Sequence, residues 1–327
     1  NPVGTSLPRL ETREKITGSA RYTDDMSLPG MLHGAVLGSP YAHARILSYD
    51  TTAAEAMDGV AAVFTGDDIG LNRIGPFVKD DFAIAKGKVR YIGEPVAAVA
   101  ATDTDTARAA TRLIDIEYEE LPAVVNVEEA LAKDAQVLHE DFADYIKTFE
   151  AESSPNVMAI VQIIEGDVDA AWAECDVIVE GDFETQAQQH VYMEPCSALA
   201  DIDAAGKITV WSGNQSVFHV QAFVAAALDM PMSKVRCITP MVGGGFGGKM
   251  EHTVQPIAAA LARKAQKPVR VTLTREQDFE MIRARHPAKV WMKTGAKVDG
   301  TLIAREVKII LDGGAYADDS PGVGAVC

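Results

Sequence analysis

The segment from Gly243 to Lys249 constrains this chain more than any other, because its sequence GGGFGGK contains five glycines. The apolar stretch 235–242 before it predicts a strand, and 253–264 after it predicts a helix with Pro256 in its first turns. Glycines let backbone N–H groups turn toward an anion without obstruction from a Cβ atom. We interpret Phe246, the single large residue among them, as one wall of a site. A tight turn that allows close packing is the alternative.

A phosphate-binding P-loop is one interpretation of this loop. Gly243, Gly248 and Lys249 satisfy the spacing G-x-x-x-x-G-K. The next residue of a P-loop is Ser or Thr, which holds Mg²⁺, whereas this chain has Met250. A thioether does not replace a hard oxygen ligand, so the sequence disfavours this interpretation.

A dinucleotide-binding loop is a second interpretation. Gly243, Gly245 and Gly248 fit G-x-G-x-x-G, which is a weak signal by itself. The motif requires an acidic residue about 20 positions further on, at the end of the next strand. Glu276 lies beyond that position and follows a Thr-Arg turn. A nucleotide-binding module using the Gly243–Lys249 loop therefore remains the alternative function.

Composition excludes several kinds of partner. The formal net charge of −17 repels nucleic acid and anionic lipid, and no apolar run reaches the ~18 residues of a membrane span. The cysteines show no C-x-x-C spacing, which disfavours an iron–sulfur cluster or zinc ribbon in this chain. Without a signal-peptide pattern at the N-terminus, we expect a cytoplasmic protein with reduced thiols. The cysteines are Cys175, Cys196, Cys237 and Cys327.

The order of predicted elements indicates an α/β (α+β) fold. A buried strand at 96–100, N-cap oxygens at 103–106, a helix at 107–113 and a strand at 114–118 form a strand–helix–strand unit. Such a unit usually places both strands in one sheet. The length of 327 residues and the hydrophobic content of 47% allow two domains. We predict an α/β domain at 1–125, a connecting segment at 126–155 and a second domain at 156–327.

Several polar residues outside the loop invite a functional interpretation. Glu194 fits a structural ion pair better than an acid–base group, and His190 and His219 fit hydrogen-bonded core residues better than ligands. Three aspartates beside a Gly-Gly pair lack the full spacing of a calcium loop, so we predict a solvated turn there. These residues are Asp312, Asp318 and Asp319.

The loop and its surroundings resemble the molybdenum subunit of the xanthine dehydrogenase/aldehyde oxidase family. Ser212-Gly213-Asn214-Gln215 is similar to the family segment that contributes a Gln beside molybdenum. In the family, a fixed number of residues separates that Gln from the residue after the loop Lys. The same spacing separates Gln215 from Met250 in this chain. Further similar segments are 189–195, 285–287 and 293–295 in the second half, and 14–22, 39–44 and 92–97 in the first.

The resemblance implies the N-terminal part of a molybdopterin-binding large subunit: a hammerhead-type α/β domain, then the first part of a mixed α/β molybdopterin-binding domain. Gln215 would hydrogen-bond the ligands of molybdenum. Gly244, Gly245, Phe246 and Gly247 would line the metal with backbone N–H groups. The implied cofactor is molybdopterin, in the cytosine dinucleotide form. The implied reaction is hydroxylation with water as oxygen source, with electrons passing to [2Fe-2S] and FAD on partner subunits.

Two departures from the family pattern shape the expectations. Purine-oxidising members have Glu where this chain has Met250, and Glu251, one place later, is turned by about 100° on a helix start. A more apolar substrate pocket favours an aldehyde or another N-heterocycle, unless Met250 merely packs. The chain also ends at Cys327, before the family's Arg-Gly-Phe-Gly segment and its catalytic glutamate. We therefore expect no catalytic base in this chain, and activity only with a C-terminal remainder or a second molybdopterin-binding chain.

Overall fold

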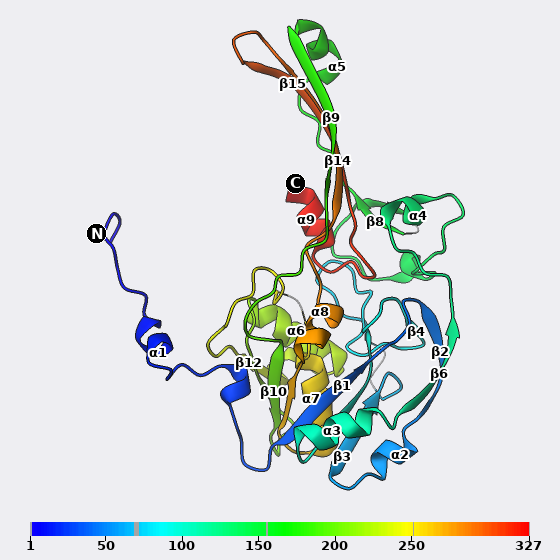
Figure 1. The fold of residues 1–327 in the computed structure, drawn as a ribbon, viewed down its shortest axis with the longest axis vertical. Coiled ribbons are helices and arrows are strands. Elements are labelled where there is room, and N and C mark those ends of the chain that lie inside the picture. Colours follow the sequence, from blue (N-terminus) through cyan, green and yellow to red (C-terminus); the bar gives the residue numbers. More distant parts are fainter. Residues whose placement is uncertain (1, 69–71, 155, 251, 327) are drawn as a thin grey trace.

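The computed structural model describes residues 2–68, 72–154, 156–250 and 252–326. Within these residues a broad body carries a narrow sheet that projects from one end, and the N-terminal segment with α1 (Thr12–Ile16) extends away from the body (Figure 1). The body is built on a sheet with the strand order β12-β11-β10-β13-β1-β5-β3. Its strands are β1 (Leu32–Gly38), β3 (Val60–Thr65), β5 (Pro95–Ala101), β10 (Ser197–Ile202), β11 (Ile208–Ser212), β12 (Val235–Ile238) and β13 (Val269–Thr272).

This sheet joins the two halves of the chain. The first-half strand β1 pairs in parallel with the second-half strand β13, with Leu32 opposite Val269 and Gly34 opposite Val271. A Cβ atom on Gly34 would lie 2.5 Å from the Val271 side chain, so glycine permits this close approach. The boundaries 1–125, 126–155 and 156–327 remain a prediction, and the first and last of these ranges share one sheet.

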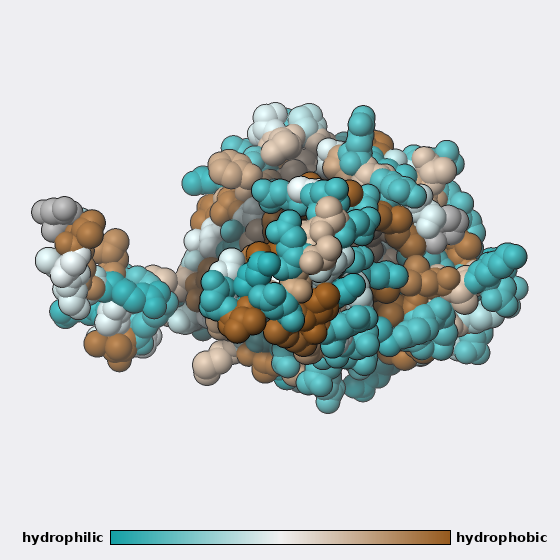
Figure 2. All heavy atoms as spheres, turned by 90° about the horizontal axis from the view of Figure 1, so that it is seen from above, coloured by the Kyte–Doolittle hydropathy of each residue, from teal (hydrophilic) through white to brown (hydrophobic). Residues whose placement is uncertain are grey.

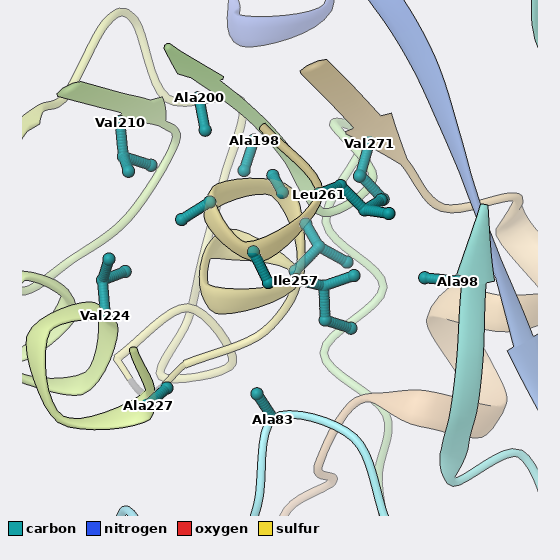
Figure 3. Packing of buried hydrophobic residues seen from close by; sticks show 14 of the residues in the cluster. Ala83, Ala98, Ala198, Ala200, Val210, Val224, Ala227, Ile257, Leu261 and Val271 are labelled. Atoms are coloured by element: carbon teal, nitrogen blue, oxygen red, sulfur yellow. The ribbon is translucent and has the colours of Figure 1, made fainter. Parts of the chain in front are cut away.

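Helix α7 (Gln255–Ala265) forms the centre of the largest hydrophobic core. Ile257 and Leu261 are completely buried, and Figure 3 shows them among side chains of the sheet and of α6 (Val217–Ala227). The predicted helix thus forms with Pro256 at its start, where the missing N–H costs no hydrogen bond. Its first residue, Gln255, lies six positions after Lys249, the last residue of the glycine loop.

The strand–helix–strand prediction for the first half was wrong in one respect. β5 lies in the large sheet, whereas β6 (Asp115–Glu120) joins β2 (Ala44–Asp50) and β4 (Lys88–Val89) in a separate sheet. Both edges of β5 are already occupied, by β1 and β3. β6 also alternates acidic residues with Ile116 and Tyr118, a pattern that buries one face only. The helix between them, α3 (Thr104–Thr111), is capped by Asp103 as expected.

The connecting segment is packed rather than a free linker. Arg73 donates a hydrogen bond to Asp141. His139 donates from Nε2 to the Ala315 carbonyl, and its Nδ1 is hydrogen-bonded to the Tyr145 hydroxyl. The short elements of the remaining chain are η1 (Thr23–Asp25), α2 (Thr52–Glu55), α4 (Val127–Leu131), η2 (Phe142–Asp144), β7 (Glu152–Ser154), β8 (Val157–Ile160), α5 (Val168–Ala171), η3 (Trp172–Glu174), η4 (Met232–Lys234), α8 (Arg275–Met281) and α9 (Ser320–Val326).

The projecting sheet consists of β9 (Val177–Thr185), β14 (Ala288–Ala296) and β15 (Leu302–Leu311), in the order β15-β14-β9. Both pairings are antiparallel. The strand predicted at 235–242 ends early, at Ile238, because Pro240 has no N–H to continue a ladder.

Candidate functional site

The glycine loop leaves the end of β12 and turns sharply before α7. Gly244, Phe246 and Gly247 have φ angles of 98°, 53° and 96°. The turn is closed by Gly248 N–H donating to the Gly245 carbonyl (2.8 Å) and by Met250 N–H donating to the Gly247 carbonyl (3.2 Å). A left-handed conformation at a phenylalanine is uncommon, and its side chain is 73% exposed. Phe246 is therefore held at the open side of the loop rather than in the core.

A buried ion pair fixes the loop from below. Lys249 Nζ lies 2.9 Å from Glu194 Oε2 and also donates to the Glu194 carbonyl, at 2.8 Å. Gly243 N–H donates to the same Oε2 at 2.8 Å. The ion-pair role predicted for Glu194 is confirmed. Because the Lys249 ammonium is only 1% exposed and is bound to Glu194, it is not available to a phosphate, as a P-loop lysine would have to be.

Gln215 lies directly against the loop. Its backbone N–H donates to the Lys249 carbonyl at 2.9 Å. Its side-chain Oε1 accepts from Gly247 N–H at 3.0 Å and from Lys249 N–H at 3.3 Å. A Cβ atom on Gly245 would collide with this Oε1. The structure therefore brings Gln215 together with the predicted loop residues, although Gly247 is 32 positions away along the chain.

Two aromatic rings form the floor of the loop. A Cβ atom on Gly248 would lie 2.8 Å from His190 Nδ1 and 3.0 Å from the Tyr192 ring. The Lys249 ammonium lies 4.5 Å from the centre of the Tyr192 ring, a cation–π contact. Burial lowers the pKa of His190 and, together with the nearby Cys196 thiol, raises the pKa of Tyr192. Both rings are therefore neutral at pH 7 and present no charge to the loop.

The floor is anchored to the core by Asp278. Its Oδ1 accepts from Cys196 N–H at 3.0 Å and from the Tyr192 hydroxyl at 3.4 Å, while its Oδ2 accepts from Arg275 at 2.9 Å. Arg275 in turn donates to the Met193 carbonyl at 2.9 Å. Burial and the adjacent carboxylate raise the pKa of the Cys196 thiol to about 12, so this cysteine is a structural thiol.

Three loop amides are left open. Among the described residues, the backbone N–H groups of Gly244, Gly245 and Phe246 have no hydrogen-bond partner. The Gln215 side-chain N–H₂ has none there either, since only its oxygen is bonded. Consecutive N–H donors without Cβ obstruction accept an anionic or oxygen-rich group. The loop therefore presents a set of donors suited to such a group.

A second cluster holds the chain just after the loop. Asp81, from the first half, accepts from His252 Nε2 at 3.1 Å and from Arg283 at 2.7 Å. Arg283 also donates to the His252 carbonyl at 3.3 Å and pairs with Asp318. Burial acts to raise the pKa of Asp81, but the hydrogen bond from His252 and the Arg283 charge outweigh it and lower this pKa. Burial lowers the pKa of His252. We call Asp81, His252 and Arg283 the clasp.

Two predictions for polar residues were wrong. Asp318 does not lie in a solvated turn: it is buried and paired with Arg283, because the chain after β15 folds back onto the clasp. His219 is exposed on α6, and its ring centre lies 6.0 Å from that of Phe223. Its side chain has no hydrogen bond to any described residue, so it is not a hydrogen-bonded core residue. Met250 is half-buried beside the loop. Glu251 and Cys327 lie outside the described residues.

One supporting residue was not anticipated. Thr23, in η1, is fully buried, and its Oγ1 accepts from Gly213 N–H at 2.9 Å. It thereby braces the segment that carries Gln215. Nothing in the sequence marks a threonine 190 positions away as a neighbour of Gly213, so local reasoning had no means of finding it.

Comparison with known families and relatives shows the family of the chain. The family model described as "Molybdopterin cofactor-binding domain" matches residues 149–327, and "Aldehyde oxidase and xanthine dehydrogenase, a/b hammerhead domain" matches residues 17–122. The chain is 40% identical to one of the probable xanthine dehydrogenase subunits of Bacillus subtilis, over 97% of its own length and 41% of the relative's. It is 37% identical to "Nicotinate dehydrogenase large molybdopterin subunit" of Eubacterium barkeri, over 98% of its own length and 73% of the relative's.

Solved structures show the same fold. Quinoline 2-oxidoreductase from Pseudomonas putida 86 matches with a TM-score of 0.80 and 31% identity, over 97% of this chain and 40% of that one. Aldehyde oxidoreductase from Desulfovibrio gigas matches with a TM-score of 0.84 and 30% identity, over 94% of this chain and 34% of that one. The fold and the matching family models define a molybdopterin-binding chain of mixed α/β architecture. It belongs to the xanthine dehydrogenase and aldehyde oxidase family of molybdenum-containing oxidoreductases.

The chain covers less than half of most of these relatives. It spans 41% of the length of the Bacillus subtilis protein and 40% or less of the two solved structures above. Within the described ranges, no helix has both the length and the hydrophobicity that crossing a membrane requires.

Proposed function

We propose that this chain forms one wall of the cofactor site of a molybdenum hydroxylase that oxidises an aldehyde or an N-heterocycle. The observation that carries the proposal is the set of open N–H donors on Gly244, Gly245 and Phe246 beside the Gln215 amide. The bound molybdopterin supplies the redox chemistry, a hydroxylation whose oxygen comes from water. The proposed domains are a hammerhead-type domain at 1–125, a connecting segment at 126–155 and the first part of the cofactor domain at 156–327.

Each residue of the wall has a distinct role in this proposal. Gly244, Gly245, Phe246 and Gly247 line the metal centre and direct backbone N–H groups toward its ligands. Gln215 is oriented because its oxygen is held by the N–H groups of Gly247 and of the following lysine. Its N–H₂ group is therefore left to donate toward the cofactor. No residue of this chain is proposed as the catalytic base.

Met250 supports the substrate class. Its thioether is apolar and flexible, and it offers a polar purine no charge and only a weak acceptor. Its half-buried position directly after the loop supports a place beside the proposed cofactor wall. The Eubacterium barkeri relative is named for nicotinate and one solved structure for quinoline, which are aromatic N-heterocycles, and another solved structure is named for aldehydes. The Bacillus subtilis relative is named for xanthine, a purine, so the names alone do not select the class and Met250 carries the argument. An aldehyde or a non-purine heterocycle is the substrate class we propose, and Met250 is its pocket residue.

The remaining components are proposed from the family. The chain covers a minority of the length of most relatives, so further polypeptide supplies the rest of the cofactor site and the glutamate base. Partner subunits carry [2Fe-2S] and FAD and take up the electrons. The cofactor is the cytosine dinucleotide form of molybdopterin, and the assembly is cytoplasmic.

The test is metal and pterin analysis of the complex purified from its host. We expect molybdenum and pterin in the complex and neither at stoichiometric level in the isolated 327-residue chain. Gln215→Ala should lower turnover with the complex still assembled. Gln188→Ala, a change at an exposed amide, is the matched control. A complex without molybdenum would contradict the proposed function, and an unchanged rate in Gln215→Ala would remove Gln215 from the site.

A further inference from the structure

Ser212, the last residue of β11, lies three positions before Gln215 and begins the segment that carries it. Ser212 is only 1% exposed, and its hydroxyl donates to the Ser197 carbonyl at 2.9 Å. A serine hydroxyl has one proton, so Ser212 Oγ can meet a further polar group only as an acceptor. The group packed against it must therefore be a hydrogen-bond donor.

The amide of Gln255, the first residue of α7, is that donor. Its Nε2 lies 2.9 Å from Ser212 Oγ, and the residue is 2% exposed. Its Oε1 accepts from Thr253 N–H at 2.7 Å. Because a backbone N–H group can only donate, this contact decides which end of the amide is oxygen and which is nitrogen. An amide meets both requirements, whereas a carboxylate meets only the first.

Two hydrogen bonds join the Gln215 segment to the chain at and after the end of the glycine loop. Gln215 N–H donates to the Lys249 carbonyl at 2.9 Å, and Gln255 donates to Ser212 at the same distance. The partners are three positions apart in one segment and six in the other. Met250, the proposed pocket residue, belongs to the part of the chain between these two bonds. Gln255 thus links the position of Gln215 to that of the chain around Met250.

Two threonines support the same segment from other parts of the chain. The N-terminal segment extends away from the body (Figure 1 and Figure 2), and Thr23 of η1, which follows it, accepts from Gly213 N–H. The side chain of Asn214 donates to Thr239 Oγ1 at 2.9 Å. Neither threonine belongs to α7 or to the chain between the glycine loop and α7. The contact made by Gln255 is therefore not duplicated by them.

We propose that Gln255 is a positioning residue, which acts through Ser212 to set the orientation of Gln215 toward the cofactor. The Gln215 oxygen is held by two loop N–H groups, so the direction of its N–H₂ group depends on where its backbone lies. Gln255 holds that backbone three residues upstream. A displacement of about 1 Å at a positioning group can cost about a hundredfold in rate. The proposal rests on the proposed function, in which Gln215 donates toward bound molybdopterin.

Gln255→Glu removes the donor and keeps the shape of the side chain. Its carboxylate still accepts from Thr253 N–H and suits the first turn of a helix, but it has no proton for Ser212. Gln255→Met has no donor in any ionisation state and is the second variant. Both are made in the full chain, which is purified with its partners from the host.

Gln277→Glu is the matched control. Gln277 lies in the first turn of α8, where its Oε1 accepts from Thr274 N–H at 3.1 Å and its Nε2 donates to the Val36 carbonyl at 2.9 Å. The same substitution therefore keeps one acceptor contact and removes one donor contact at the start of another helix. A general effect of losing such a hydrogen bond would appear equally at both positions.

A double-mutant cycle with Gln215→Ala tests whether Gln255 acts through Gln215. In the native background we expect each Gln255 variant to lower kcat at least about tenfold. In the Gln215→Ala background the same change should lower kcat less than about twofold, because the group that Gln255 positions is already absent. Gln277→Glu should also lower kcat less than about twofold. Equal factors in both backgrounds, an unchanged kcat in Gln255→Met, or an equal loss in Gln277→Glu would overturn the proposal.

Hydrogen exchange of the peptide 212–216 gives a readout that needs no turnover. We expect faster exchange in the Gln255 variants and the native rate in Gln277→Glu, and circular dichroism checks that each has folded. Molybdenum analysis of the same complexes separates the two proposals. Faster exchange in a complex without molybdenum contradicts the proposed function but supports the hold of Gln255 on the Gln215 segment. Unchanged exchange in a complex with molybdenum contradicts the role of Gln255 alone.

Discussion

The ammonium of Lys249 lies 2.9 Å from the carboxylate of Glu194, and the two side chains are only 1% and 10% exposed. This pair ties the end of the glycine loop to the segment that forms its floor. Glu194 also accepts from Gly243 N–H, so one carboxylate holds both ends of the loop. The lysine that a motif search would assign to a phosphate is thus a structural residue.

Removing the lysine should destabilise the chain strongly. Lys249→Met leaves the Glu194 carboxylate buried without its counter-charge, and we expect a loss of about 3–5 kcal/mol in the free energy of unfolding. Urea denaturation followed by circular dichroism measures it. Lys264→Met, which removes an exposed partner of Asp68, should cost less than about 1 kcal/mol. The double variant Lys249→Met with Glu194→Gln should recover part of the loss, and equal losses in the two single lysine variants would contradict the buried-pair interpretation.

A Cβ atom at position 245 should displace the Gln215 side chain from the loop. In Gly245→Ala the new methyl group collides with Gln215 Oε1, although the φ angle of Gly245 is not in the left-handed region. We expect at least about a tenfold loss of molybdenum and pterin per chain in the complex, because the donors can no longer converge. Gly324→Ala is the control, since its Cβ would be 3.9 Å from the nearest atom, Leu311 Cδ1. Full cofactor content in Gly245→Ala would show that the loop is not part of the cofactor site.

The clasp should hold the segment after the loop in its folded conformation. Asp81→Asn removes the charge that pairs with Arg283 and weakens the hydrogen bond from His252, at a cost of at least about 2 kcal/mol. Hydrogen exchange should become faster in the peptide around residues 249–254, while β5 and β11 remain protected. Asp141→Asn, at a half-exposed ion pair with Arg73, should change neither quantity appreciably. An unchanged rate of hydrogen exchange around residues 249–254 in Asp81→Asn would show that the clasp does not position this segment.

The free energy of unfolding should fall as pH rises, because buried Asp80 loses its proton in the folded state. Burial and the nearby Asp81 charge outweigh its hydrogen bond from Ala317 N–H and raise its pKa to about 7. The folded state therefore binds a proton that the unfolded state loses near its ordinary pKa of 3.8. The stabilising contribution is complete below about pH 4 and is lost as pH rises to about 7. Its full size is at most about 4 kcal/mol.

Asp80→Asn isolates this effect, because it keeps an oxygen for Ala317 N–H and removes the titration. The variant should show a smaller drop in unfolding free energy between pH 5 and pH 8 than the native chain. Denaturation curves at pH 5, 6, 7 and 8 measure the slope. Parallel pH profiles of the two proteins would rule out the raised pKa of Asp80.

The sequence by itself determined the elements whose signal is local. Asp103 caps α3 and Pro256 opens α7 because capping and proline chemistry act within one turn. The family and its loop were also determined by sequence, since the glycines and Gln215 keep a fixed order and spacing. The ion pair of Glu194 could be predicted as a type of interaction, although its partner Lys249 could not.

Tertiary structure alone decided which strands became neighbours. β5 could not pair with β6 once β1 and β3 occupied its edges, and local sequence carries no record of that competition. Thr23 contacts Gly213, and Asp81 contacts His252, although each pair is separated by more than 150 positions in the sequence. Many other residues of the same types could form these hydrogen bonds, so the sequence does not show which of them are partners. Sequence periodicity fixes which residues share a face, but only packing decides which faces are buried and which, like that of β9, remain exposed.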